Sequence, residues 1–262
     1  MGKKMLNPPI FYTVGQIRFN PVLNMGDFVP KIHERLRKKF PEVRQEELRR
    51  VQMNFAAQDG KDAVNTFAAP RWSFANLLRT SGYALTTDSL VFHTTAYETS
   101  DEFYEALLSG IRLLDEAVGL SYIEGVGLRT LDAVVPSGGR PIAFYLNNQV
   151  LGLFGLLTGE IKHNITENVT TFPTGQQVSR VVIAIGPLGT PVDLFPIQLT
   201  IGKRFQEVNG IHAVLDLDHN RQDRFEFNLS EIEERVRQVK AGVTDVFYKV
   251  TTTEARDAWD SL

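Results

Sequence analysis

Residues 211–220 read IHAVLDLDHN, and this stretch decides the fold class. Apolar residues alternate along it with mostly polar ones, which is the period of a β-strand that buries one face. We therefore predict that Leu215 and Leu217 face the core and that Asp216 and Asp218 lie on the exposed face. The opposite arrangement would desolvate two carboxylates, which is costly.

A helix is predicted after this strand, over residues 229–250, with residues 219–224 as the connection. Apolar residues recur there at steps of three and four, so they form a narrow stripe along one side of the helix. Such a stripe fits either a coiled-coil partner or the protein's own sheet. The many preceding strands and Gly242 favour the sheet. A last short helix is expected to start at Thr251, with Glu254 completing a capping box.

The first half of the chain also combines strands with an amphipathic helix. Residues 10–19 and 72–97 are rich in β-branched and aromatic residues, and turn residues interrupt the second stretch. Strands with such short connections must be antiparallel. A stripe of apolar residues over 103–118 predicts a helix, with Thr99 and Glu102 as its capping box.

Together these patterns predict an α+β fold with largely antiparallel sheets and long amphipathic helices. The stretch PSGGRP at residues 136–141 has the composition of a linker. We therefore expect two similar-sized halves, an N-terminal half at residues 1–136 and a C-terminal half at residues 141–262. The long helix at residues 229–250 belongs to the second half.

Composition restricts the classes of function. The 262 residues include no cysteine, which excludes disulfides, thiolate zinc sites and cysteine nucleophiles. A formal net charge of −3 argues against binding nucleic acid or an anionic membrane through bulk charge. No uninterrupted apolar run approaches the ~18 residues that a membrane span requires. We expect a soluble, cytoplasmic protein without a membrane partner.

Three residues at the end of the deciding strand could hold a divalent cation. Asp216 and Asp218 share one face of the strand, about 7 Å apart, and His219 follows directly. The alternative is a solvated strand face that runs into a polar turn, where Arg221 and Arg224 oppose a bound cation. A metal-dependent hydrolase built on these three residues therefore stays an alternative.

A basic cluster is the second candidate site. Residues 26–41 predict a helix with one apolar side, and its last turns are basic. Cations there complement the helix dipole, whereas a surface that tracks phosphates is the functional alternative. The candidate nucleic-acid-binding residues are Arg35, Arg37, Lys38, Lys39, Arg49 and Arg50.

The remaining patterns indicate no catalytic site. The sequence contains no nucleophile elbow, zinc-protease motif or phosphate-binding loop, and the histidines do not cluster. We therefore expect neither catalytic residues nor a cofactor. The favoured hypothesis is a non-catalytic binding or regulatory protein that presents a surface to another protein, with nucleic-acid association as the alternative. A homo-oligomer also stays open.

Several short motifs follow one another along the chain. They are an N-terminal Pro-Pro, an Arg-Phe strand, a Trp-x-Phe strand, a Tyr-then-Phe helix start and a Gly-Leu-Arg strand. In this order they resemble a sporadically distributed prokaryotic family of uncharacterised proteins, and the resemblance spans nearly the whole chain. The residues that carry it are Pro8, Pro9, Arg18, Phe19, Trp72, Phe74, Tyr97, Phe103, Gly127, Leu128 and Arg129.

The resemblance implies no activity, because the family has no assigned catalytic residues. Its patchy distribution implies cargo of mobile or defence-related gene clusters, with a protein partner encoded nearby. The chain reads QVKAGV at residues 238–243 where the family helix has a leucine–histidine pair, which puts in doubt any role of that histidine here. Arg129 is expected to serve structure rather than chemistry, because Leu128 and Leu131 flank it in a strand.

Overall fold

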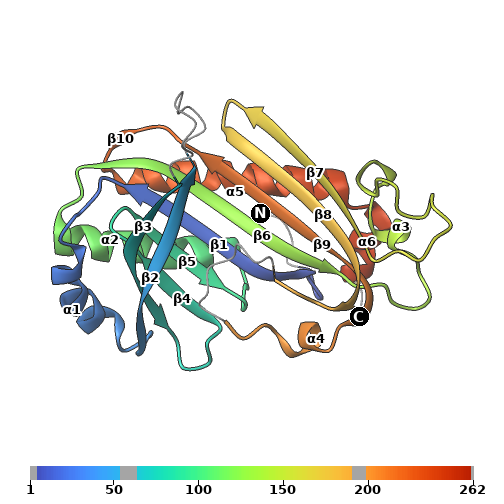
Figure 1. Ribbon diagram of the computed structural model, residues 1–262, viewed down its shortest axis with the longest axis horizontal. Helices are drawn as coiled ribbons and strands as arrows, with labels where there is room; N and C mark the ends of the chain where they lie inside the picture. The colour runs from blue at the N-terminus through green and yellow to red at the C-terminus, as the bar shows by residue number, and fades with distance from the viewer. Residues whose placement is uncertain (1–4, 54–63, 191–198, 261–262) are drawn as a thin grey trace.

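Alternating apolar residues build one antiparallel sheet in the computed structural model (Figure 1). The structure describes residues 5–53, 64–190 and 199–260. Within these residues the sheet has ten strands in the order β2-β3-β4-β5-β1-β6-β9-β8-β7, and β10 pairs with β6. The elements are β1 (Ile10–Phe19), α1 (Met25–Leu36), β2 (Glu42–Met53), β3 (Val64–Ala75), β4 (Ser81–Leu85), β5 (Ser89–Thr94), α2 (Ser100–Val118), β6 (Tyr122–Val134), α3 (Ile142–Tyr145), η1 (Asn148–Val150), β7 (His163–Phe172), β8 (Gly175–Pro187), α4 (Lys203–Gln206), β9 (Asn209–Arg221), β10 (Phe225–Glu226), α5 (Leu229–Val250) and α6 (Thr253–Trp259).

The predicted fold class is wrong in its division into two similar-sized halves. β6 pairs with β1 on one side and with β9 on the other, so strands from both predicted halves share one continuous sheet. The physical reason is that a central strand needs hydrogen-bond partners for its backbone along both sides. Long amphipathic helices are also not the general rule, because the described helices other than α2 and α5 have at most 12 residues.

The α5 helix spans residues 229–250, as its apolar spacing predicts. Its N-cap is Asn228, whose side-chain oxygen accepts hydrogen bonds from the backbone N–H groups of Ser230 and Glu231. The α6 helix, in contrast, is capped by Thr252 and not by the predicted Thr251. The hydroxyl of Thr251 instead donates a hydrogen bond to the carbonyl of Phe247.

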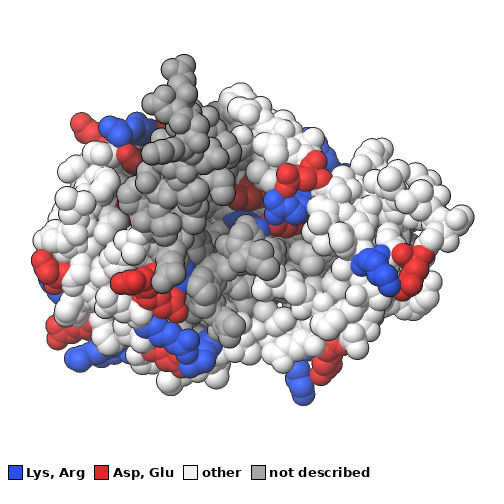
Figure 2. Space-filling model, viewed as in Figure 1, with Lys and Arg blue, Asp and Glu red and all other residues white. Residues whose placement is uncertain are grey.

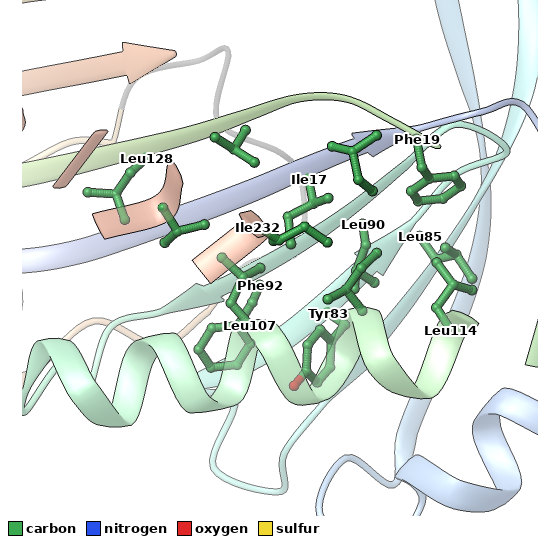
Figure 3. Close-up of a cluster of buried hydrophobic side chains, with 14 of the residues drawn as sticks. Ile17, Phe19, Tyr83, Leu85, Leu90, Phe92, Leu107, Leu114, Leu128 and Ile232 are labelled. Atoms are coloured by element: carbon green, nitrogen blue, oxygen red, sulfur yellow. The ribbon is translucent and has the colours of Figure 1, made fainter. Parts of the chain in front are cut away.

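The main hydrophobic core lies between the sheet and the helices α2 and α5, which both cover the back face of the sheet in Figure 1. Figure 3 shows Leu107 of α2 near Phe92 of the sheet and Leu114 of α2 near Leu85, with Ile232 of α5 in the same cluster. All five side chains are buried. The apolar stripes of both helices are therefore used inside the protein, and the sheet interpretation of the α5 stripe is the correct one.

The β9 strand is longer than predicted. It continues to Arg221, so the expected connection over residues 219–224 begins too early. The side chain of His219 points to the back face, where it lies under α5. A Cβ atom built on Gly242 would lie 2.2 Å from Nδ1 of this histidine. The glycine therefore lets α5 approach the sheet.

Replacing Gly242 by alanine should destabilise the protein. Alanine is the better helix former by about 1 kcal/mol, but forcing a methyl group against a buried ring costs about 1–3 kcal/mol. We expect a net loss in the free energy of unfolding, measured by urea denaturation. Gly159→Ala is the control, because nothing lies within 4 Å of its Cβ position. Equal stability of the two variants would contradict close packing of α5 on His219.

Candidate interaction surface

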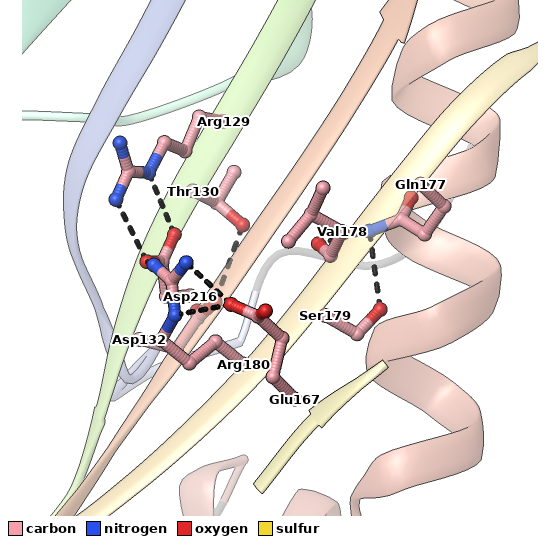
Figure 4. Close-up of polar contacts among 9 residues, drawn as sticks. All are labelled: Arg129, Thr130, Asp132, Glu167, Gln177, Val178, Ser179, Arg180 and Asp216. Carbon is pink, nitrogen blue, oxygen red and sulfur yellow. Dashed lines mark hydrogen bonds and ion pairs between the residues drawn. The ribbon is translucent and has the colours of Figure 1, made fainter. Parts of the chain in front are cut away.

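Asp216 lies at the centre of a polar network on the front face of the sheet, which is the face toward the viewer in Figure 1. Arg129 of β6 donates to its two carboxylate oxygens at 2.6 and 2.7 Å, and Arg180 of β8 donates to Oδ2 at 2.8 Å (Figure 4). The side chain of Asp216 is only 3% exposed. The prediction of an exposed Asp216 is therefore wrong.

The error has a clear physical cause. Period-two alternation places Asp216 on the face opposite Leu215 and Leu217, and both leucines are buried as predicted. Asp218 shares the front face and is partly exposed. The alternation of apolar and polar residues does not show, however, whether a buried charge has partners of opposite charge. Two guanidinium groups from neighbouring strands replace the water that a buried carboxylate would lose, so Asp216 can be buried while charged.

The network continues to the edge of the sheet. Arg180 donates from Nε and Nη2 to Glu167 of β7 at 2.8 and 2.5 Å. Charges thus alternate across four neighbouring strands, from Arg129 through Asp216 and Arg180 to Glu167, and we call this row the charge ladder. Burial alone lowers the pKa of Arg180, but the hydrogen bond to Glu167 and the charge of Asp216 outweigh it and raise that pKa. Figure 2 shows acidic and basic side chains gathered near the middle of the same face.

Arg129 has the carboxylate partner that a structural role requires, and its side chain is 14% exposed. The same side chain also borders a cavity of about 270 Å³ on the front face, together with Arg18 and Asp218. Each of the two arginines is held by an acid, Arg129 by Asp216 and Arg18 by Glu124. The bidentate pair therefore favours structure as the first role of Arg129.

The predicted metal ligands do not come together. His219 points to the opposite face from Asp216, and its ring nitrogens contact Oε1 of Gln177 at 3.1 Å and the carbonyl of Thr174 at 3.2 Å. Burial lowers the pKa of this histidine, against a smaller raising effect of the Thr174 carbonyl. Over residues 5–53, 64–190 and 199–260, no group of three acidic or histidine side chains has the geometry of a metal site. The metal-dependent hydrolase alternative thus has no support in the arrangement of these residues.

The basic cluster is divided. Arg35 points to α2, where it pairs with Glu116 at 2.5 Å, and Arg37 lies 4.0 Å from Glu34. Lys38 and Lys39 are exposed in the turn after α1. Arg49 and Arg50 belong to β2, but their side chains lie outside the described residues.

The two edges of the sheet differ in character. Half of the 12 residues in β2 are Glu or Arg, which discourages pairing with another chain. In β7 the only such residue is Glu167, and the charge ladder already engages it. Ile165 and Val169 flank it on the same face and are 57% and 53% exposed. β7 is therefore the less protected edge.

Further exposed leucines lie in the segment after η1, which contacts the face of β7 opposite to Ile165 and Val169. The segment after η1 lies against the start of the strand, because the side-chain amide of Asn164 donates to the carbonyl of Leu151 at 3.1 Å. Its leucines at 153, 156 and 157 are 60%, 73% and 69% exposed. Such a concentration is unusual for a surface without a partner. We call β7 and these residues the β7 edge; its apolar members that are more than half exposed are Leu153, Leu156, Leu157, Ile165 and Val169.

The sequence does not predict the place of β7 at the edge of the sheet. Alternation identifies strands, whereas edge position depends on which strands pair. Comparisons of the chain with protein-family models, with curated proteins and with solved structures found no match. Among the described residues, no helix has both the length and the apolar character needed to cross a bilayer.

Replacing Asp216 by asparagine should lower the free energy of unfolding by about 3 kcal/mol, because two arginines would lose their shared, buried carboxylate. Urea denaturation at pH 7 measures the change. Asp245→Asn serves as the control, since its pair with Lys249 is exposed and should contribute less than about 1 kcal/mol. A loss as small as that of the control would show that the ladder adds little to stability.

Proposed function

We propose that the protein is a non-catalytic binding component that takes up an extended segment of another protein along the β7 edge. The observation that carries this proposal is the exposed apolar character of an uncapped edge strand. β7 ends the strand order, so one side of its backbone has no neighbouring strand in the described part of the chain. An added strand would use those backbone groups and cover Ile165 and Val169.

The charge ladder supports this use of β7. Glu167 lies between the two exposed apolar residues, and its carboxylate is held by Arg180. A partner strand would therefore meet no unneutralised charge on the front face of β7. The opposite edge is less suitable, because charged residues recur along β2. A segment with alternating apolar and small polar residues is the chemistry that fits.

Nucleic-acid association has weaker support. Arg35 is engaged by Glu116, and the described part of the basic cluster leaves Arg37, Lys38 and Lys39 at one turn. The residues of the charge ladder balance one another, so they do not supply a positive surface. The resemblance to a family associated with mobile or defence-related gene clusters motivates a search for the partner among proteins encoded nearby.

Substituting lysine for both Ile165 and Val169 should abolish partner binding without unfolding the protein. The added charges oppose strand pairing at the edge, while surface substitutions change stability by only about 0.5 kcal/mol. The measurement compares proteins that co-purify from the native host with tagged wild type and with the double variant. The partner should be lost from the variant.

Val43→Lys is the matched control, because Val43 is a 40% exposed apolar residue on the other edge strand, β2. A partner that survives the β7 substitutions and leaves with the β2 substitution would overturn the assignment. Light scattering of the purified protein identifies self-association. A wild-type dimer that the β7 substitutions convert to a monomer would make the partner a second copy of this chain.

A further inference from the structure

A second site lies on the back face, away from the β7 edge. A cavity of about 600 Å³ opens between β6, the start of α2 and the middle of α5. This volume is within the range of small-molecule pockets. Asp132 and Thr130 of β6 and Lys240 of α5 line it on one side, and Tyr97 and Tyr104 line it near the start of α2.

Asp132 is a buried acid with few partners. Its side chain accepts a long hydrogen bond, 3.4 Å, from the hydroxyl of Thr130, and the residue is only 4% exposed. Burial raises its pKa to about 7, although the charge of Lys240 and the Thr130 hydrogen bond act in the opposite direction. Near neutral pH this carboxyl group can therefore both donate and accept a proton.

Lys240 faces the same cavity from the α5 side. It lies four residues after Val236 and three before Val243, so it belongs to the helix side that packs on the sheet. Its ammonium donates to Oγ1 of Thr244 at 3.1 Å. Burial lowers its pKa, and the charge of Asp132 offsets part of this effect. Lys240 and Asp132 line the same cavity and interact through their charges, but no direct hydrogen bond or ion pair joins them within the described residues.

Four aromatic side chains contribute to the remaining lining, together with the N-terminal segment and the charged residues Glu98, Asp101 and Arg237. Tyr97 donates to or accepts from the hydroxyl of Ser100 at 2.8 Å, and Phe247 and Tyr248 approach from the end of α5. Burial raises the pKa of Tyr104 to about 12, so its hydroxyl stays protonated at neutral pH. Apolar rings around a few polar groups are typical of pockets for small organic ligands.

We propose that this pocket binds a small aldehyde or ketone and holds it as an imine on Lys240, with Asp132 as the proton-transfer group. The cavity, the amine and the acid meet at one place, while the aromatic lining suits an aromatic or unsaturated carbonyl compound. This inference goes beyond the proposed binding of a protein segment, because it uses different elements and a different class of ligand.

The reaction requires no further reagent. The neutral amine of Lys240 attacks the carbonyl carbon, and a C–N bond forms. Protonated Asp132 gives its proton to the carbonyl oxygen and then takes one from the nitrogen, which yields a neutral carbinolamine. Asp132 next protonates the hydroxyl group, the C–O bond breaks, and water leaves an iminium ion. The Asp132 carboxylate removes the proton from the iminium nitrogen, so the products are an imine and one water molecule, and Asp132 is regenerated.

Reductive trapping tests the proposal on the full-length protein. Wild type is treated at pH 7 with benzaldehyde and sodium cyanoborohydride, which converts an imine into a stable secondary amine, and the label is located by peptide mass spectrometry. Lys240 should be labelled faster than Lys249, because burial lowers the pKa of Lys240 and so raises the fraction of its amine that is neutral at pH 7. Lys249 is the internal control, since it is exposed and paired with Asp245.

Two variants separate the roles. Lys240→Met should lose the fast label and keep slow labelling of Lys249. Asp132→Asn should slow labelling of Lys240 by about a hundredfold if Asp132 transfers the proton. Loss of the carboxylate charge alone would instead favour the neutral amine and speed the reaction. A wild-type map in which Lys249 reacts as fast as Lys240 would overturn the site, and faster labelling of the Asp132 variant would remove Asp132 from the mechanism.

Discussion

The buried carboxylate of Asp216 is the constraint on which the second half of the sheet depends. It is compensated only if Arg129 on one neighbouring strand and Arg180 on the other occupy their observed positions. A slip of one residue in β9 would turn Asp216 toward the apolar helix layer and Leu217 toward the front face. The charge ladder and the hydrophobic core therefore specify the same register of β9. A change of register would disrupt both of them.

This constraint reaches the edge of the molecule. Because Arg180 pairs with both Asp216 and Glu167, the ladder that orders the interior also neutralises the one acidic residue of β7. The edge is left with exposed apolar side chains and hydroxyl or amide groups, whereas β2 carries many charges. This asymmetry is the basis of the proposed partner site at the β7 edge.

The back face of the sheet is mainly apolar. Helices α2 and α5 cover it with apolar residues over most of its area (Figure 3), and their separation near the start of α2 leaves the cavity around Asp132 and Lys240. Polar groups in such a layer are costly unless they have partners or a function. The cavity and the β7 edge use separate elements, so the two proposed sites do not overlap.

Local periodicity by itself determined much of this protein. It predicted α5 over residues 229–250, the burial of Leu215 and Leu217, and antiparallel pairing, because these depend on neighbours a few residues away. Lys240 lies beside the apolar stripe of α5, but its spacing alone does not indicate a site. The basic helix and the acidic strand were equally visible in the sequence, yet their residue types alone did not identify a functional site.

Tertiary structure decided the rest. The partners of Asp216 lie 87 and 36 residues away in sequence, so no local pattern could show that its charge is compensated. Pairing of β6 with β9 converts two expected halves into one sheet, and the strand order makes β7 an edge. The physical reason is that periodicity reports which side of an element is apolar, whereas burial of a charge, edge position and a shared cavity depend on which distant elements meet.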